Sequence, residues 1–251
     1  MRLPCVNGGG LQSIVRLDQT AVIEREVALP PKAVRALSFW GYRPGSILTV
    51  VDQLDIVFRA RLLGPGEVVP FEVLTSNLVP AVPVVLYQAL PERERFELVL
   101  EKAVELGADR IVPFVSSRST TPEARDSKQR KSHRWPEIVK RAAKQCRRPD
   151  IPELGPVMTF EEVLEETTCW DLNVMFYEGE TTLRLRDALQ RPGISSVALI
   201  VGPEGGFSLM ETQQAAATGV QPVTLGQRIL RTETAAIAGV SLLQYALGSL
   251  G

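Results

Sequence analysis

Two glycine-containing loops, each following a short apolar run, constrain this chain more than any other feature. In the first, residues 197–201 are five consecutive apolar residues and are followed by Gly202, Gly205 and Gly206. Such a run predicts a strand buried on both faces, and the glycines let the backbone turn where side chains would collide. The pattern therefore predicts a parallel α/β sheet with a helix directly after the loop.

The helix after the first loop is expected to begin at Ser208. Ser208 stands three residues before Glu211, which is the spacing of a capping box, and Gly219 is the expected end signal. Three further elements are expected along the chain: a short strand at residues 223–225, a polar turn at 227–234 and an apolar helix at 235–247.

The two loops should lie at the carboxyl ends of neighbouring strands, where open α/β sheets bind ligands. The first loop lacks both the Gly-Lys-Ser/Thr ending of a nucleotide-phosphate loop and the Gly-x-Gly-x-x-Gly spacing of a dinucleotide site. Glu204 lies inside the glycine cluster, where its carboxylate would repel a bound phosphate. A phosphate-free ligand fits better, such as an adenosine that carries a sulfonium and an amino acid. The alternative is a plain tight turn, which gains nothing from a Pro-Glu pair.

Several motifs extend the pattern beyond the first loop. They are Gly-Pro-Glu-Gly-Gly-Phe-Ser at 202–208, Leu-Gly-Gln-Arg-Ile-Leu-Arg-Thr-Glu-Thr-Ala at 225–235, Glu-Lys-Ala-Val-Glu-Leu-Gly at 101–107, Ile-Val-Pro-Phe at 111–114, Arg118, and Lys-Gln-Cys-Arg-Arg at 144–148. In these motifs the chain resembles the RsmE family of the SPOUT superfamily, methyltransferases that act on N3 of a uridine in small-subunit (16S) ribosomal RNA. The resemblance is specific over residues 82–250 and weaker before them.

The resemblance implies two domains. A PUA-like, RNA-binding β-barrel is expected over residues 1–78, and a SPOUT methyltransferase domain with a trefoil knot over 79–251. The residue pattern by itself predicts an all-β segment in the first domain, with runs at 21–23, 47–51, 56–62 and 68–74, and a parallel sheet of five or six strands in the second, including 84–89, 111–115 and 173–177. The first domain departs from the family at Cys5, where an arginine is usual, so its grip on RNA is expected to be weaker or remodelled. A barrel of this size could instead serve dimerisation or stability.

The resemblance also implies the cofactor, S-adenosylmethionine, and the residues that hold it. The expected cofactor-binding residues are Tyr177, Glu178, Gly179, Val201, Gly202, Pro203, Glu204, Gly205, Gly206, Leu225, Gly226, Arg228, Ile229, Leu230, Arg231, Thr232, Thr234 and Ala235. The expected catalytic residues are Glu233, which accepts or positions the imide proton of the uracil, and Arg118 and Arg231, which stabilise negative charge on its oxygens.

A basic segment provides the expected RNA-binding surface. Residues 118–150 contain eleven Lys/Arg and four Asp/Glu, although the whole chain has a net charge of −1. Such an asymmetry favours contact with polyanions, and arginine suits phosphates and base edges because its planar fork keeps its proton. The expected RNA-binding residues are Arg118, Lys144, Gln145, Arg147 and Arg148. The alternative is a solvated face of a helix at 136–146.

Composition excludes several other classes of protein. Three cysteines without a Cys-x-x-Cys pair, and His133 as the only histidine, disfavour disulfides, a zinc site and a histidine-based triad. No apolar run is long enough to span a membrane, and residues 1–10 do not form a signal peptide, so a cytoplasmic protein is expected.

The expected partners are small-subunit ribosomal RNA, within an assembled 30S particle, and a second copy of the chain, because the family acts as homodimers. No metal and no membrane are expected. Two alternatives stay open: a knotted RNA methyltransferase with another target, a ribose 2'-hydroxyl or a tRNA, and a catalytically inactive RNA-binding ribosome assembly factor.

Overall fold

The structure, a computed structural model, describes residues 14–74, 82–119, 134–146, 148, 151–179 and 183–250. The chain divides into two compact units. The first comprises Met1–Pro80 with Ala143–Ile151, and the second Ala81–Ala142 with Pro152–Gly251. Cys5 and most of the expected boundary around residue 78 lie outside the described residues. The division into domains 1–78 and 79–251 therefore stays a prediction.

The N-terminal unit is built on a five-stranded sheet in the order β1-β3-β4-β5-β2. Its strands are β1 (Ile14–Arg16), β2 (Val27–Ala28), β3 (Ile47–Val51), β4 (Val57–Gly64) and β5 (Glu67–Leu74). β1 runs parallel to β3, and the other pairs are antiparallel. The runs at 47–51, 56–62 and 68–74 are thus confirmed as strands, whereas residues 21–23 lead into a turn.

The expectation of an all-β first domain is wrong in one respect, because helix α1 (Pro31–Trp40) interrupts the strands. Pro31 supplies a fixed backbone angle at the first helical position. Ala33 and Leu37, four residues apart, are buried and pack with Val50 and Phe58 in the core of this unit. The sheet therefore has one face covered by a helix, which a search for alternating strands could not anticipate.

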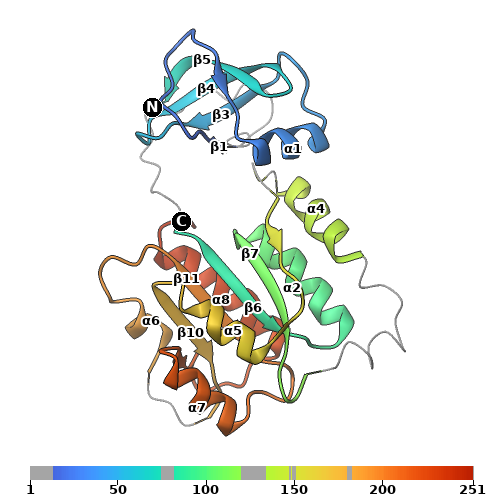
Figure 1. Ribbon diagram of the computed structural model, residues 1–251, viewed down its shortest axis with the longest axis vertical. Helices are drawn as coiled ribbons and strands as arrows, with labels where there is room; N and C mark the ends of the chain where they lie inside the picture. The colour runs from blue at the N-terminus through green and yellow to red at the C-terminus, as the bar shows by residue number, and fades with distance from the viewer. Residues whose placement is uncertain are drawn as a thin grey trace. The chain divides into compact units, whose positions relative to one another are not determined.

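The second unit is built on a parallel sheet in the order β12-β10-β11-β6-β7-β8, with β9 pairing to β7 (Figure 1). Its strands are β6 (Val84–Ala89), β7 (Arg110–Val115), β8 (Glu153–Leu154), β9 (Met158–Thr159), β10 (Leu172–Phe176), β11 (Val197–Val201) and β12 (Gln221–Val223). The described sheet therefore has seven strands rather than five or six, because two-residue strands β8 and β9 carry no sequence signal.

Helices cover both faces of this sheet. They are α2 (Arg93–Glu105), α5 (Phe160–Thr167), α6 (Leu185–Ala188), α7 (Leu209–Ala217) and α8 (Thr232–Ala246). A further helix, α4 (Trp135–Gln145), begins with Trp135, whose ring packs against Phe96 of α2. Phe160 of α5 and Ala215 of α7 pack into one core cluster with Tyr87 and Ile200 of the sheet. On the other face α2 and α8 lie side by side, with α8 against β6 and β11 (Figure 1). The sheet is thus the middle layer of three.

The helix boundaries confirm most of the expected signals. Ser208 accepts a hydrogen bond from the backbone of Glu211, whose side chain accepts one from Ser208, so the capping box of α7 is present. Gly219, with φ +89°, follows the end of that helix. α4 also forms as expected, with Ile138, Val139, Ala142 and Ala143 buried.

Two expected boundaries near the C-terminus are shifted. β12 spans Gln221–Val223 rather than 223–225, and α8 begins at Thr232 rather than 235. Two residues explain the earlier start of α8. The hydroxyl of Thr232 makes a buried hydrogen bond that is described below, and the negative charge of Glu233 is favourable at the positive N-terminal end of a helix. Glu233 therefore lies in the first turn of α8 and not in the preceding loop.

Candidate active site

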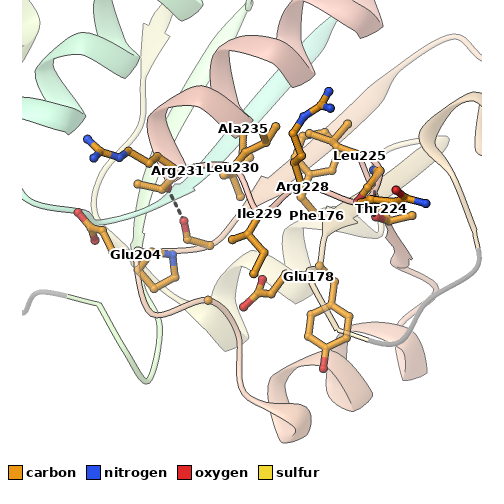
Figure 2. Close-up of a pocket in the computed structure, with 18 of the residues that line it drawn as sticks. Phe176, Glu178, Glu204, Thr224, Leu225, Arg228, Ile229, Leu230, Arg231 and Ala235 are labelled. Carbon is orange, nitrogen blue, oxygen red and sulfur yellow. Dashed lines mark hydrogen bonds between the residues drawn. The ribbon is translucent and has the colours of Figure 1, made fainter.

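A pocket of about 290 Å³ lies at the carboxyl ends of β10, β11 and β12 (Figure 2). Segments that follow these three strands line it, together with one residue from α2 and the start of α8. The lining residues are Arg95, Phe176, Tyr177, Glu178, Val201, Gly202, Pro203, Glu204, Gly206, Thr224, Leu225, Gly226, Gln227, Arg228, Ile229, Leu230, Arg231, Thr232 and Ala235.

The expected cofactor-binding residues all line this pocket except three. Gly205 instead packs against the side chain of Arg118, and Thr234 is exposed on α8. Gly179 lies in the segment after β10, and a Cβ atom at this position would collide with the ring of Tyr177. The two glycine-containing loops therefore converge on one pocket, but the strands that they follow are not neighbours as expected, because β10 lies between β11 and β12.

Four lining residues were not anticipated: Arg95, Phe176, Thr224 and Gln227. Arg95 comes from the first turn of α2, more than 100 positions before the glycine loops, so no local motif connects it with them. Phe176 ends β10 and Thr224 follows β12. Both would have been found had the strand ends been located correctly, because side chains at the carboxyl ends of parallel strands face the same crevice.

A buried polar contact ties the two loops together at the floor of the pocket. The Thr232 hydroxyl donates to the Gly202 carbonyl oxygen at 2.5 Å, and the Gln88 amide donates to the Thr232 hydroxyl at 3.0 Å. Gln88, at the end of β6, is fully buried and Thr232 is 6% exposed. Buried polar groups of this kind are costly to leave unpaired, so the contact fixes the start of α8 against the end of β11.

Glu204 points out of its own glycine loop towards the start of α2. One carboxylate oxygen accepts a hydrogen bond of 2.8 Å from the backbone of Glu92 and lies 3.6 Å from Nε of Arg95. The same guanidinium lies 3.9 Å from the carboxylate of Glu233. Arg95 therefore bridges a residue of the first loop and the expected proton acceptor on α8.

The expected catalytic residues occupy different parts of this region. Arg231 lines the pocket. Glu233 is not among the lining residues; its side chain is 13% exposed, and its carboxylate lies 3.9 Å from the guanidinium of Arg95, which does line the pocket. The guanidinium of Arg118, which follows β7, donates a hydrogen bond of 2.7 Å to the carbonyl oxygen of Gly205. All three lie in the same unit, and the first glycine loop connects Arg118 to the pocket.

Glu178 and Ile229 add a carboxylate and an apolar side chain to the lining. Glu178 lies against Gly206, which has φ +66° and where a Cβ atom would collide with the carboxylate. Ile229, from the second loop, is 84% exposed and projects above Glu178 (Figure 2). The pocket thus combines a carboxylate, an exposed apolar side chain and backbone groups of the two loops.

The expected RNA-binding residues other than Arg118 lie at the end of α4 or just after it. Lys144 and Gln145 are exposed in the last turn of α4, and Arg148 is partly buried. Arg147 lies outside the described residues. These positions belong to the N-terminal unit, whereas Arg118 belongs to the second unit. Trp135, at the start of α4, is 7% exposed and packs edge-on against Phe96, with ring centroids 4.6 Å apart.

Two features are absent from the described ranges, a group of side chains that could bind a metal ion and a helix that could span a membrane. Within them, no group of three or more His, Cys, Asp or Glu side chains is arranged to hold a metal ion. None of the helices described there is both long and apolar enough to cross a membrane.

Comparison with known proteins identifies the class to which this fold and pocket belong. Residues 79–244 match the family model of the RNA methyltransferase domain. A protein named Ribosomal RNA small subunit methyltransferase E from Mycobacterium bovis is 32% identical over 238 residues, which cover 92% of this chain and 86% of that protein. Its counterpart from Mesomycoplasma hyopneumoniae is 34% identical over 167 residues, covering 66% and 71%.

A solved structure extends the likeness to the fold. The crystal structure of the Neisseria gonorrhoeae Ribosomal RNA small subunit methyltransferase E, bound to S-adenosyl methionine, is 30% identical in sequence and has a TM-score of 0.62. The match covers 93% of this chain and 97% of that one. This chain belongs to the ribosomal RNA small subunit methyltransferase E family, as its glycine loops indicate.

Proposed function

We propose that this chain is an S-adenosylmethionine-dependent methyltransferase that places a methyl group on N3 of a uridine in 16S ribosomal RNA. The observation that carries the proposal is the pocket at the ends of β10, β11 and β12, in a chain of the RNA methyltransferase domain family. Open α/β sheets bind their ligands at this position. The family membership supports the choice of ribosomal RNA as the substrate.

The residues of the pocket fit S-adenosylmethionine. Its volume is close to the lower end of the range of small-molecule sites, about 300–1,000 Å³. Leu225, Ile229 and Leu230 offer apolar surface to an adenine ring, and the carboxylate of Glu178 suits a cationic ligand. Glu204 adds a second carboxylate to the lining, inside the first glycine loop, where it would repel a phosphate. When bound, S-adenosylmethionine supplies an electrophilic methyl group.

The chain's own residues must prepare the acceptor. Uracil N3 carries an imide proton and is masked by base pairing, so the base has to be unpaired and has to lose that proton. Glu233 accepts or positions the proton, because its carboxylate lies beside the pocket and Arg95 holds it. Arg118 and Arg231 stabilise the negative charge that develops on the uracil oxygens, since fixed cations at such oxygens lower the barrier.

The N-terminal unit is a PUA-like barrel that holds the RNA, with Lys144, Gln145, Arg147 and Arg148 as further contacts. Its five-stranded sheet with one helix-covered face supports this assignment. The exposure of Lys144 and Gln145 supports their role, because a side chain must reach the solvent to contact RNA, and the cation of Lys144 suits a phosphate. The substrate is an assembled 30S particle, and the reaction takes place in the cytoplasm.

The second unit contains the trefoil knot of SPOUT proteins. The path of the chain supports this assignment, because it leaves β12 at one edge of the sheet and α8 then packs against β11, β6 and α2 further across it. Such a knot is one of the rare exceptions to unknotted chains. It brings the second glycine loop back over the ends of β10 and β11, where the pocket lies.

The active form is a homodimer that packs through α8 and α2. Tyr245 and Leu242 of α8 are 70% and 46% exposed, and Leu98 of α2 is 41% exposed. Exposed apolar side chains on two helices that pack against each other favour a protein partner. A second copy of the chain would cover them and could contribute side chains to the pocket of its partner.

Nucleoside mapping tests this function. Small-subunit RNA from cells that lack the protein should lack one N3-methyluridine, and the purified chain with S-adenosylmethionine should restore it on 30S particles. Methylation of a ribose 2'-hydroxyl or of a tRNA would reassign the target. Cofactor binding without any methylation of RNA would favour an inactive assembly factor, and more rapid methylation of free RNA than of 30S particles would contradict the assembled substrate.

A further inference from the structure

The carboxylate of Glu211 accepts more hydrogen bonds than a helix cap requires. Glu211 is 6% exposed and lies in the first turn of α7. Ser208 donates its backbone N–H and its hydroxyl, both at 2.8 Å. Ser117, from the loop after β7, donates its backbone N–H at 2.9 Å and its hydroxyl at 2.8 Å. The carboxylate thus joins α7 to a loop 94 positions away in sequence.

A second capping box in the same unit shows what a cap alone uses. At the start of α5, Glu162 accepts a hydrogen bond of 2.7 Å from the backbone of Thr159, whose hydroxyl accepts one from Glu162. Glu162 is exposed, and the contacts described for its side chain are those of the cap. The two bonds from Ser117 are therefore an addition to the cap of α7 rather than a part of it.

The loop that Glu211 holds carries Arg118. Residues 116–119 form a tight turn in which the backbone N–H of Ser119 donates to the carbonyl oxygen of Ser116 at 3.1 Å. The Ser119 hydroxyl accepts from the backbone of Ser116 at 3.0 Å. Anchoring Ser117 therefore fixes the position from which the Arg118 side chain starts.

From this turn the Arg118 side chain runs along the first glycine loop. A Cβ atom on Gly205 would lie 3.2 Å from Cβ of Arg118, so a larger residue there would have to push the arginine aside. The guanidinium then donates to the carbonyl oxygen of Gly205 at 2.7 Å. Arg118 is itself exposed, so packing on other side chains does not fix it.

We propose that Glu211 is a positioning residue, which sets Arg118 beside the first glycine loop in the place where the target base is methylated. The proposal rests on the proposed function, because it assumes that Arg118 meets the uracil or the adjoining phosphates. Glu211 itself contacts neither RNA nor cofactor. It acts through Ser117, in the way that outer hydrogen-bond partners orient the groups that perform a reaction.

Glu211→Gln is the most direct perturbation. An amide has one oxygen to accept with and adds two donors, so it cannot receive the four bonds that the carboxylate receives. Turnover should fall about 10- to 100-fold, the range found when a positioning contact is lost. The dissociation constant for S-adenosylmethionine should change less than about threefold, because Glu211 does not line the pocket.

A double-mutant cycle separates positioning from general damage. Glu211→Gln, Arg118→Ala and the double variant are compared for turnover on 30S particles. If Glu211 acts through Arg118, Glu211→Gln should lower turnover by less than about threefold in the Arg118→Ala background. The reason is that the effects of residues that act as a unit do not add. An equal cost in both backgrounds would overturn the proposal.

Two further variants guard against loss of folding. Ser117→Ala removes one bond to the loop and leaves the cap of α7 intact, so turnover should fall about three- to tenfold with little change in the melting temperature. Glu162→Gln makes the same chemical change in the capping box of α5 and should leave turnover unchanged. Wild-type turnover in Ser117→Ala, or a loss in Glu162→Gln equal to that in Glu211→Gln, would contradict the assignment.

Amide hydrogen exchange keeps this proposal distinct from the proposed function. In the full-length protein, Glu211→Gln should speed exchange at residues 116–119 by at least about tenfold and leave β11 unaffected. Unchanged exchange would refute the positioning role even in an active methyltransferase. Faster exchange in a protein that methylates no uridine would retain the structural link and reject the proposed function instead.

Discussion

The hydroxyl of Thr232 donates a hydrogen bond to the carbonyl oxygen of Gly202, 30 positions earlier in the chain, at 2.5 Å. The contact joins the first turn of α8 to the end of β11, and Gln88 supports it from the end of β6. One hydroxyl thereby connects the two loops that define the pocket. The site depends on this buried link as much as on the glycines that shape each loop.

Replacing Thr232 by valine should therefore weaken both the fold and the site. The change keeps the shape of the side chain but leaves the amide of Gln88 and the carbonyl of Gly202 with one partner fewer. Both groups keep a partner, because the Gln88 amide still donates to the carbonyl oxygens of Ala89 and Gly202. The two lost hydrogen bonds contribute about 0.5–1.5 kcal/mol each, so the free energy of unfolding should fall by about 1–3 kcal/mol. Denaturant unfolding and calorimetric titration of S-adenosylmethionine measure the two effects. Thr218→Val, which removes a hydroxyl on the exposed end of α7, is the matched control. Equal stability of the two variants would contradict the prediction.

Gly239→Ala should destabilise the second unit although alanine favours a helix. In a free helix the substitution gains about 1 kcal/mol. On α8 the new Cβ would lie 2.8 Å from Leu199 and collide with the ring of Phe176, and overpacking of this kind costs about 1–3 kcal/mol or more. Because Phe176 lines the pocket, cofactor affinity should fall as well.

Thermal unfolding of the Gly239→Ala variant checks this balance. Gly64→Ala serves as the control, because nothing lies within 4 Å of a Cβ atom placed there. A melting temperature of Gly239→Ala at or above that of the wild type would show that α8 does not press against β10 and β11.

Glu233→Gln should reduce turnover far more than cofactor affinity. The amide keeps the size of the side chain but cannot accept a proton, and loss of a general base typically costs about 10²- to 10⁴-fold. Single-turnover kinetics with 30S particles and calorimetry with S-adenosylmethionine separate the two quantities. Glu94→Gln, an exposed change on α2, is the control. Equal losses of turnover and affinity would make Glu233 a wall of the pocket.

Low pH should weaken the hydrogen bonds by which the Glu211 carboxylate joins α7 to the loop that carries Arg118. Burial alone would raise the pKa of Glu211, but the hydrogen bonds from Ser117 and Ser208 outweigh it and leave the pKa below its ordinary value of 4.5. A carboxyl with a lowered pKa in the folded state stabilises the protein above that ordinary value. Its contribution is lost as the pH falls through the lowered pKa.

The free energy of unfolding of the wild type and of Glu211→Gln should therefore differ by a constant amount between about pH 6 and 8. The difference should shrink below about pH 4.5, because the carboxyl of the unfolded chain binds a proton there and the folded chain, with its lowered pKa, does not. Urea titrations at a series of pH values measure it. A difference that stays constant down to pH values well below 4.5, or that grows as the pH falls, would contradict the hydrogen-bonded carboxylate.

Charge reversal at Arg148 should weaken RNA binding and flatten its dependence on salt. A cation that neutralises a phosphate releases a counterion, so its loss should lower the slope of log affinity against log salt by about one. Fluorescence titration of an rRNA fragment at several salt concentrations measures the slope. The same charge reversal at Arg186, an exposed arginine on α6, is the control. An unchanged slope for the Arg148 variant would remove this residue from the RNA-binding surface.

The parts of the fold that the sequence predicts well are those with local signals. β6 and β11 begin and end as their apolar runs indicate, and the Ser208 and Glu211 pair marks the start of α7. Most pocket residues were predicted from the family resemblance, whose motifs lie in the first glycine loop and in the polar loop before the last helix.

The remaining features arise from contacts between distant residues. Arg95 reaches Glu204 and Glu233 from α2, and Gln88 supports Thr232 from β6, so no spacing in the chain reveals either contact. The start of α8 was placed three residues late because Thr232 and Glu233 look like loop residues until the carbonyl of Gly202 is beside them. Tertiary hydrogen bonds, rather than local propensity, set these boundaries.

The pocket's preference for a phosphate-free, cationic adenosine ligand is the claim on which the other conclusions depend. Calorimetric titration of the purified chain with S-adenosylmethionine, and separately with ATP, tests it most directly. We expect stoichiometric binding of S-adenosylmethionine and no measurable binding of ATP. Gly206→Val should abolish the binding of S-adenosylmethionine, because a β-branched residue is strained at φ +66° and its side chain would displace the Glu178 carboxylate. Absence of S-adenosylmethionine binding, or binding of ATP with equal affinity, would contradict it.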